Sequence, residues 1–224
     1  MKQRSIILLG LAVVVLTVGI VGTYWRAHRY DAPALVAPIP AGIQTAYFAG
    51  GCFWCTEADF EKMPGVIAVV SGYQGGHTEH PTYPQVVTET TGHRETVEVR
   101  YDPTVVDYQK LVAYFFAHVD PTDSGGSFVD RGESYTSAIF YRTEAEHESI
   151  TAEVLRLTQA GAYTEPIVTS VLPWSTFWPA EEYHQDYHTK NAVRYGYYRN
   201  ASGRDQKIAE LCAYRKTRGV PCFE

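Results

Sequence analysis

The stretch that organises this chain is Gly50-Gly51-Cys52-Phe53-Trp54-Cys55-Thr56-Glu57, in which two cysteines enclose two large aromatic side chains. An apolar segment, Thr45–Ala49, comes before the glycine pair, and Pro64-Gly65 follows the stretch. Glycines allow a strand to turn sharply into a helix, and a Pro-Gly step is typical of the end of a helix. We therefore expect a strand over residues 45–49 and a helix over Cys52–Met63.

The remaining hydrophobic patterns indicate mixed secondary structure. The segment TVEVRY alternates as a half-buried strand should, and Thr143 with Glu146 matches a capping box for a helix that reaches about Gln159. Asp107 is suited to cap another helix. The expected further strands are Val66–Val70, Thr96–Tyr101, Ser137–Tyr141 and Ile167–Leu172. The predicted fold is α+β: a single two-layer domain with helices packed on a mixed, largely antiparallel sheet, preceded by an N-terminal transmembrane helix.

Composition limits the class of protein. The 224 residues are 45% hydrophobic and 20% charged, which is enough for one or two domains with a real core. The formal net charge is −6, so no basic field points to nucleic acid as a partner. The 17 tyrosines supply hydroxyl donors wherever a polar ligand is held beside apolar walls, although most are expected to line the edge of the core.

The N-terminal part differs from the rest. Residues 6–22 carry no charge, and Thr23-Tyr24-Trp25 follows as an interfacial edge. Such a run is marginally long enough to span a bilayer as a helix. Residues 26–42 are rich in proline and alanine, a composition typical of a semi-rigid tether. The expected parts are a membrane anchor over 1–25, a tether over 26–42, a globular domain over 43–210 and a C-terminal tail with two cysteines over 211–224.

A cleaved signal peptide is the alternative for the N-terminus, because Lys2 and Arg4 make a short basic start. The apolar run is long for a signal, and Arg26, His28 and Arg29 follow it without a small-residue cleavage pattern, which favours an uncleaved anchor. Lys2 and Arg4 before the apolar run are nearly balanced by Arg26 and Arg29 after it, so the charges do not decide the orientation of the anchor. We expect the globular domain on the exported, periplasmic or extracytoplasmic side, because one N-terminal anchor with a Pro/Ala tether is a common exported arrangement.

The two thiols indicate redox chemistry. At the N-terminus of a helix, unpaired N–H groups and the helix dipole favour the thiolate of Cys52. Cys55 would lie one turn further on, within reach of Cys52. A structural disulfide between residues three apart would constrain the unfolded chain little. A zinc site would need a second CxxC or CxxH, which the sequence lacks, so no metal site is predicted.

The aromatic pair between the thiols argues against a general disulfide exchanger, whose site keeps small or polar residues there. Phe53 and Trp54 can instead wall an apolar pocket for a small methyl-bearing group beside the sulfur. Both rings can also be ordinary core residues of a helix.

An ordered set of motifs resembles the peptide-methionine (S)-S-oxide reductases, the A-type methionine sulfoxide reductases. The resemblance covers roughly Thr45 to Asp205, and the set is far more specific than any one of its members. The motifs are Gly51-Cys52-Phe53-Trp54, Ser71-Gly72-Tyr73, Gly75-Gly76, Pro81-Thr82-Tyr83, Thr91-Gly92-His93-Arg94-Glu95, Tyr101-Asp102-Pro103, Asp120-Pro121-Thr122, Asp130-Arg131-Gly132 with Tyr135, Ser137-Ala138-Ile139 and His184-Gln185-Asp186-Tyr187.

The resemblance implies a role for each matching site residue. Cys52 would attack the sulfoxide sulfur, and Glu95, kept partly neutral by burial, would protonate the sulfoxide oxygen. Tyr83 and Tyr135 would donate hydrogen bonds to that oxygen, and Asp130 would help hold the site or the incoming peptide. Phe53 and Trp54 would hold the substrate methyl group. Without the family, Glu95 would be taken as solvated surface, Tyr83 as a loop tyrosine and Asp130 as a turn former.

The implied reaction leaves Cys52 as a sulfenic acid, which a second thiol converts to a disulfide. Cys55 is the favoured resolving thiol, although many family members resolve with cysteines near the C-terminus. Cys212 and Cys222 can pair with each other, relay the disulfide or be bystanders. No cofactor is expected to be bound; an external dithiol such as thioredoxin or a thioredoxin-like protein would recycle the enzyme.

The predicted function is reduction of methionine (S)-sulfoxide, free or in oxidised proteins. One alternative is a CxxC thiol-disulfide oxidoreductase that uses Cys52 and Cys55 on protein disulfides without any sulfoxide. Another is a membrane-anchored binding module for oxidised methionine, in which Cys52→Ser would function normally.

Overall fold

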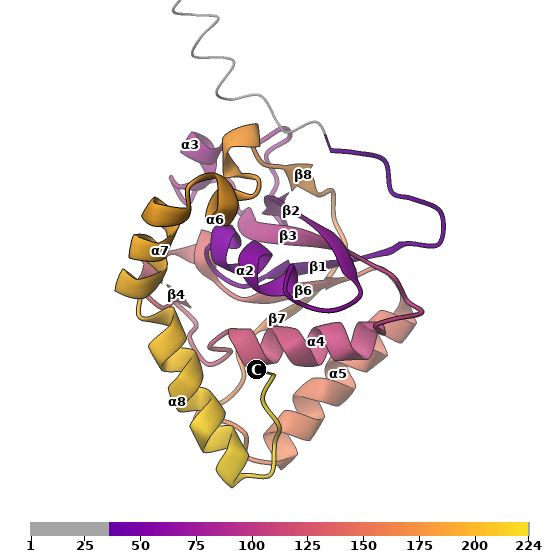
Figure 1. Cartoon of the computed structure of the whole chain (residues 1–224), viewed down its shortest axis with the longest axis vertical. Helices are drawn as coiled ribbons and strands as arrows, with labels where there is room; N and C mark the ends of the chain where they lie inside the picture. The colour runs from indigo at the N-terminus through magenta and orange to yellow at the C-terminus, as the bar shows by residue number, and fades with distance from the viewer. Residues whose placement is uncertain (1–35, 224) are drawn as a thin grey trace, which may run out of the picture.

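The computed structural model describes residues 36–223, and its centre is a six-stranded sheet in the order β7-β6-β1-β3-β2-β8 (Figure 1). Every neighbouring pair is antiparallel except β6 and β7, which are parallel. The prediction of a mixed, largely antiparallel sheet is confirmed. The strands are β1 Gln44–Ala49, β2 Val66–Gln74, β3 Arg94–Tyr101, β6 Ala138–Tyr141, β7 Ser170–Pro173 and β8 Trp178–Pro179, with β4 Gly126–Ser127 and β5 Asp130–Arg131 in a separate two-stranded sheet.

The register of β1 against β3 shows how the sequence sorts the two faces of the sheet. Ala46 lies opposite Val99 and Phe48 opposite Val97, and all four belong to the main hydrophobic core. Tyr47, between them in sequence, points to the other face, where it contributes to a smaller apolar cluster. Alternation by two therefore decides which side chains meet the helices.

Helices pack on the sheet and against one another. Helix α2 packs on β2 and β3, and α4 packs against both α5 and α8, so segments far apart in sequence enclose the main core (Figure 1). The helices are α2 Phe53–Phe60, α3 Tyr83–Val86, α4 Tyr108–His118, α5 Glu144–Gln159, α6 Tyr187–Lys190, α7 Ala192–Ala201 and α8 Arg204–Thr217, with short 3₁₀ turns η1 Glu133–Tyr135 and η2 Glu182–His184.

Both predicted N-caps form, but the capping box at Thr143 lacks one of its two hydrogen bonds. The Asp107 carboxylate accepts a hydrogen bond of 2.7 Å from the Lys110 N–H at the start of α4. At the start of α5 the Thr143 hydroxyl accepts from the Glu146 N–H, at 3.2 Å. The Glu146 carboxylate, however, accepts from the Arg142 N–H rather than from the cap residue itself. The helix starts where the motif predicts, without the reciprocal bond of a complete capping box.

Three strand predictions differ from the structure. The strand expected over Val66–Val70 continues to Gln74. The strand expected from Ile167 begins only at Ser170, because the Val168 N–H donates to the Pro121 carbonyl at 2.8 Å and is unavailable to the sheet. The segment TVEVRY is buried on both faces rather than one. Its outer face carries an ion pair between Arg100 and Glu98, and Arg100 also donates to the Ala37 carbonyl, which belongs to the predicted tether.

The C-terminal segment packs on the domain. Helix α8 runs without a break across the boundary expected at residue 210, and Cys212 forms a disulfide with Cys222 beyond the helix end. Val220 is buried, and the Phe223 ring lies 5.4 Å from the Tyr114 ring of α4. Residues 211–223 are therefore part of the fold.

The membrane anchor predicted for residues 1–25 lies outside the described residues. Within residues 36–223, none of the helices combines the length and the apolar character needed to cross a bilayer.

Candidate active site

Cys52 is the N-cap residue of α2, as the sequence predicts. The preceding Gly51 has φ of 82°, a conformation that favours glycine, and a Cβ there would lie 2.4 Å from the Ser127 Cβ. The glycine therefore lets the hairpin of β4 and β5 approach the start of the helix. Cys52 is buried in this position, with 6% of its surface exposed.

Cys55 follows one turn later, and the two free thiols share a hydrogen bond. Burial raises the pKa of Cys52 well above its usual value, and the contact with Cys55 raises it further. The hydrogen bond from Cys52, against the effect of burial, lowers the pKa of Cys55 to about 7. Burial and the neighbouring Cys55 and Glu95 therefore oppose the Cys52 thiolate that a helix N-terminus favours.

Glu95 occupies the helix-facing side of β3, in the same alternation as Val97 and Val99, and is 2% exposed. Its carboxyl accepts a hydrogen bond of 2.8 Å from the Phe53 N–H and another from the Tyr135 hydroxyl. Burial raises the pKa of Glu95 to about 8, despite those donors. The group is therefore a neutral carboxylic acid near pH 7, as a proton donor must be.

The two predicted tyrosines meet beside Glu95 from different segments. Tyr83 begins α3 and Tyr135 ends η1, and their hydroxyls share a hydrogen bond. Burial raises the pKa of both, that of Tyr83 to about 12, so both are neutral hydroxyls. Glu181 fixes the start of α3, because its carboxylate accepts from the Tyr83 N–H and from the Tyr73 hydroxyl, each at 2.8 Å.

Asp130 reaches the site through a residue that the sequence analysis missed. The Tyr198 hydroxyl donates a hydrogen bond to the Asp130 carboxylate and also contacts the Cys52 thiol. Tyr198 lies on α7, in the segment Tyr195-Gly196-Tyr197-Tyr198, where three tyrosines give no signal of which one faces the thiols. Only the packing of α7 identifies it.

Phe53 and Trp54 have different environments. Phe53 is 1% exposed and belongs to the core, with its ring 4.9 Å from the His184 ring. Trp54 is half-buried, stacks flat on Tyr187 at 3.7 Å, and donates from Nε1 to His184 Nδ1 at 3.1 Å. Trp54 is thus the more accessible aromatic wall, and Phe53 backs it from within the core.

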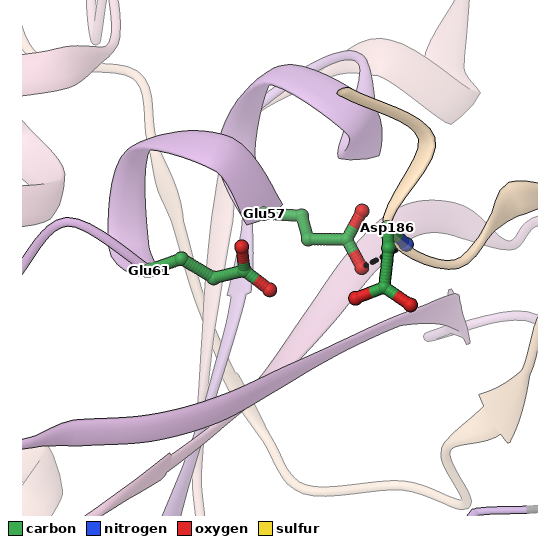
Figure 2. A group of neighbouring side chains, drawn as sticks. All are labelled: Glu57, Glu61 and Asp186. Atoms are coloured by element: carbon green, nitrogen blue, oxygen red, sulfur yellow. Dashed lines mark hydrogen bonds between the residues drawn. The ribbon is translucent and has the colours of Figure 1, made fainter. Parts of the chain in front are cut away.

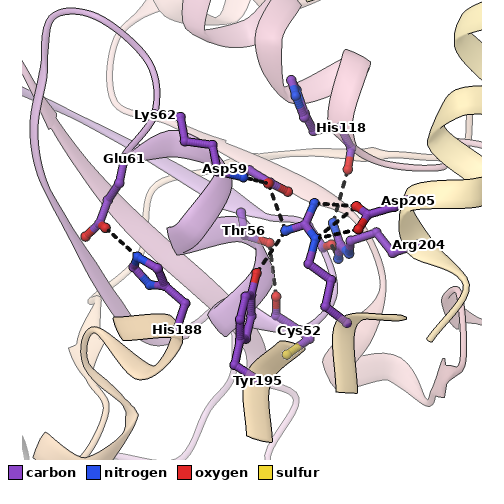
Figure 3. A network of polar contacts seen from close by, with 12 residues as sticks. Cys52, Thr56, Asp59, Glu61, Lys62, His118, His188, Tyr195, Arg204 and Asp205 are labelled. Atoms are coloured by element: carbon purple, nitrogen blue, oxygen red, sulfur yellow. Dashed lines mark hydrogen bonds and ion pairs between the residues drawn. The ribbon is translucent and has the colours of Figure 1, made fainter. Parts of the chain in front are cut away.

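A network of arginines lies next to Cys55, and none of it was singled out from the sequence. Arg199 pairs with Asp59 at 2.8 Å and with Asp205 at 2.7 Å, and donates to the Tyr195 hydroxyl at 2.9 Å. Arg204 is buried close by and donates to backbone carbonyls. Figure 3 shows this network, with Cys52, Asp59, His118, Tyr195, Arg204 and Asp205 labelled.

A carboxylate cluster lies on another side of α2. The oxygens of Glu57, Glu61 and Asp186 lie within 4.8 Å of one another, and Figure 2 shows the three side chains pointing together. Glu57 is fully buried and accepts from the Asp186 N–H at 3.2 Å. Burial raises the pKa of Glu57 to about 8, and the neighbouring carboxylates add to the shift. Lys190 pairs with Asp186 at 3.2 Å and so balances one of the charges.

Cys212 and Cys222 are joined to each other rather than to the CxxC pair. Cys212 lies eight residues along α8 from Arg204, about 12 Å of helix. Of the alternatives open from the sequence, mutual pairing is the one that this structure contains.

Comparison with known proteins gives one consistent result. The family model described as "Peptide methionine sulfoxide reductase" matches residues 44–216. A Bacillus licheniformis protein named "Peptide methionine sulfoxide reductase MsrA" is 50% identical over 162 residues, which cover 72% of this chain and 90% of that protein. A Vibrio cholerae protein named "Peptide methionine sulfoxide reductase MsrA/MsrB" is 50% identical over 179 residues, 80% of this chain but 47% of that protein, so the chain spans about half its length.

The fold of this chain also resembles the folds of solved structures. Methionine sulfoxide reductase A of Corynebacterium diphtheriae aligns with a TM-score of 0.62 and 32% identity, over 73% of this chain and 87% of that one. The reduced form of Mxr1 from Saccharomyces cerevisiae aligns with a TM-score of 0.66 and 29% identity, over 70% and 91%. The chain therefore belongs to the peptide methionine sulfoxide reductase family and is an enzyme of its MsrA type.

Proposed function

We propose that this protein reduces methionine (S)-sulfoxide, free or in oxidised proteins, to methionine at Cys52. The observation that carries the proposal is the buried, neutral Glu95 carboxyl, held by the Phe53 N–H immediately after the nucleophile and by Tyr135. An acid in that position is suited to protonate an oxygen that leaves a sulfur attacked by Cys52.

In the first step, the Cys52 sulfur attacks the sulfoxide sulfur while Glu95 protonates the oxygen. Tyr83 and Tyr135 donate hydrogen bonds to the same oxygen, where negative charge develops as the S–O bond breaks. The thioether is released and Cys52 is left as a sulfenic acid, so the substrate gains two electrons and the thiol loses two. The oxygen, carrying the proton from Glu95, becomes bonded to the Cys52 sulfur as the bond between the two sulfurs breaks, and the proton lost by the Cys52 thiol returns Glu95 to its acid form.

Substrate placement rests on the aromatic side chains. Trp54 is half-buried and stacked on Tyr187, which supports a rigid apolar wall for the substrate methyl group. Phe53 lies behind it in the core and completes the apolar side of the site. The contact of Asp130 with Tyr198, which reaches Cys52, supports a role for Asp130 in holding the site.

In the second step, the Cys55 sulfur attacks the Cys52 sulfenic acid. An S–S bond forms, the S–O bond breaks and water leaves. The hydrogen bond between the two thiols supports Cys55 as the resolving residue. An external dithiol, thioredoxin or a thioredoxin-like protein, then reduces the disulfide, and no bound cofactor is required.

We also propose a membrane-anchored enzyme with its catalytic domain on the exported side. The uncharged run of residues 6–22 and the Pro/Ala-rich tether that follows it support this placement. Fractionation of cells, followed by protease treatment of spheroplasts, tests it. Protection of the domain in intact spheroplasts would contradict the exported orientation.

The reaction is tested with separated S and R epimers of a methionine sulfoxide derivative and dithiothreitol, by measuring methionine. We expect turnover of the S epimer alone, abolished in Cys52→Ser. The CxxC oxidoreductase alternative predicts disulfide exchange without sulfoxide turnover, and the binding-module alternative predicts that Cys52→Ser functions normally. Folded protein that turns over neither epimer would overturn the proposal.

A further inference from the structure

Glu181 is a buried carboxylate that takes no part in the proposed reaction steps. Only 2% of its surface is exposed, and it lies between β8 and η2. One of its oxygens accepts a hydrogen bond from the Tyr73 hydroxyl and the other from the Tyr83 N–H, each at 2.8 Å. The carboxylate therefore joins three segments, because Tyr73 belongs to β2 and Tyr83 begins α3.

Burial makes these two hydrogen bonds important. A buried carboxylate is costly unless donors replace the water that it has lost. The His184 ring lies 3.9 Å from the carboxylate, but burial lowers the pKa of His184 to about 3, so the ring is neutral. The Tyr73 hydroxyl and the Tyr83 N–H therefore stabilise the carboxylate, and a shorter side chain would strain or break these bonds.

The segment that carries Glu181 is fixed to β2. The Gln185 side chain accepts from the Ser71 N–H and donates to the Ser71 carbonyl, both at 2.9 Å. The Ala180 N–H donates to the same carbonyl at 2.9 Å. Glu181 thus extends from a backbone held on both sides, so the length of its side chain sets the position of the Tyr83 N–H.

The start of α3 is joined to this segment through Glu181. The helix has four residues, and its capping box joins Thr82 to Gln85 within the same segment. Val86, at the other end, is buried in the main core. The bond to Glu181 therefore holds the first residue, Tyr83, in place.

Tyr83 carries this placement to the reacting atoms. Its hydroxyl shares a hydrogen bond with Tyr135, and its ring lies 4.6 Å from the His184 ring. In the proposed reaction the Tyr83 hydroxyl donates to the sulfoxide oxygen as the S–O bond breaks. Such a donor depends on its distance, since a misplacement of about 1 Å can slow a reaction by about 10²-fold.

We propose that Glu181 is a positioning residue for the reduction step: it holds Tyr83 where the Tyr83 hydroxyl meets the sulfoxide oxygen. The inference rests on the proposed reductase function. Glu181 acts only through Tyr83, and it exchanges no proton or electron during the reaction.

Two substitutions separate the length of the side chain from its charge. Glu181→Gln keeps the length, and its amide can accept from the Tyr83 N–H and donate to the Tyr73 hydroxyl. Glu181→Asp keeps the charge but is shorter by one carbon–carbon bond, about 1.5 Å. Each is made in the full chain, alone and together with Tyr83→Phe.

The measurement is methionine release in single turnovers without reductant, over a range of methionine (S)-sulfoxide concentrations. It gives a maximal rate and a half-saturating concentration for each variant. Urea denaturation of the same proteins reports their stability.

We expect Glu181→Asp to lower the maximal rate about tenfold and Glu181→Gln to change it less than about threefold. The half-saturating concentration should change less than about threefold, because charge develops on the oxygen only as the S–O bond breaks. In the Tyr83→Phe background, Glu181→Asp should slow release by less than about a further twofold, because the hydroxyl through which it acts is gone.

Glu182, the next residue, provides a matched control. Its carboxylate is exposed and pairs with Lys190 at 3.0 Å. Glu182→Asp shortens a carboxylate side chain by the same length, and it should leave both the maximal rate and the half-saturating concentration unchanged.

Four results would overturn the proposal. They are an unchanged maximal rate in Glu181→Asp, equal slowing with and without the Tyr83 hydroxyl, slowing by Glu181→Gln as large as by Glu181→Asp, and failure of either variant to fold, which would assign Glu181 to the stability of the fold. Absence of methionine release from the unmodified chain is a different result, because it contradicts the reductase function itself.

Discussion

The carboxyl group of Glu95 accepts a 2.8 Å hydrogen bond from the backbone N–H of Phe53, the residue immediately after Cys52. This contact joins β3 to the first turn of α2 and places an acid beside the nucleophile. The same N–H is one of the unpaired donors at the start of the helix, so the bond also satisfies a group that would otherwise be buried without a partner.

Replacing Glu95 with glutamine should remove the proton donor and keep the fold. The amide oxygen can still accept from Phe53, so we expect the rate of methionine release to fall about 10²- to 10⁴-fold with little loss of stability. Single-turnover measurements check this. Glu98→Gln is the matched control, since Glu98 is a buried carboxylate on the opposite face of the same strand. Equal losses in the two variants would contradict a specific role for Glu95.

The rate of methionine release should depend on pH through Glu95. The acid form is required, and burial raises its pKa to about 8, so the rate should be insensitive to this group below pH 7 and fall about tenfold per unit above 8. Single turnovers from pH 6 to 10 with the S epimer test this. A rate that rises steadily through pH 9 would show that thiol ionisation, rather than Glu95, governs the step.

Glu57 should make the protein less stable as pH rises. Its pKa is about 8 in the folded protein and near 4.5 in the unfolded chain, so the folded state binds the extra proton between these values. The free energy of unfolding should therefore fall across this window, by on the order of 1–3 kcal/mol. Glu57→Gln does not titrate, and its stability relative to the unmodified chain should improve from pH 5 to pH 8 in urea denaturation. Parallel stability curves would refute this.

Tyr198→Phe should weaken catalysis by removing the hydroxyl between Asp130 and Cys52. We expect about a tenfold lower single-turnover rate, and a combined Tyr198→Phe/Asp130→Asn variant no worse than the poorer single variant, because both act through one contact. Tyr197→Phe is the control, since the Tyr197 side chain is 80% exposed. Fully additive losses would mean that the two residues act independently.

Removal of the C-terminal disulfide should affect stability more than turnover. Cys212→Ala/Cys222→Ala should lower the free energy of unfolding by about 2 kcal/mol, as expected for a short closed loop. Turnover with dithiothreitol should continue because Cys55 remains. In Cys55→Ser, by contrast, sulfenic acid should accumulate on Cys52 and be trapped by a dimedone-type reagent. Loss of Cys52–Cys55 disulfide formation in the double alanine variant would instead assign the C-terminal cysteines to a relay.

Patterns among residues close in sequence were enough to predict many of the helices and strands. The glycine pair, the alternating TVEVRY segment and the caps at Asp107 and Thr143 act through near neighbours in sequence, so the elements form where the sequence predicts them. The predicted start of β7 was wrong because the Val168 N–H donates to the carbonyl of Pro121, more than 40 residues away. A contact of that kind has no local signal.

The sequence by itself determined the order of the chemistry-bearing groups: Cys52 at a helix start, Cys55 one turn later, and Glu95 on a strand. Tertiary structure alone decided their ionisation. Burial opposes the effect of the helix N-terminus on Cys52 and makes Glu95 a neutral acid. The packing of α7 and α8 brings Tyr198 to Cys52 and Arg204 to the Gly50 carbonyl. The physical reason is that desolvation and buried charge depend on every segment packed around a group, and those segments lie up to about 150 residues apart in the chain.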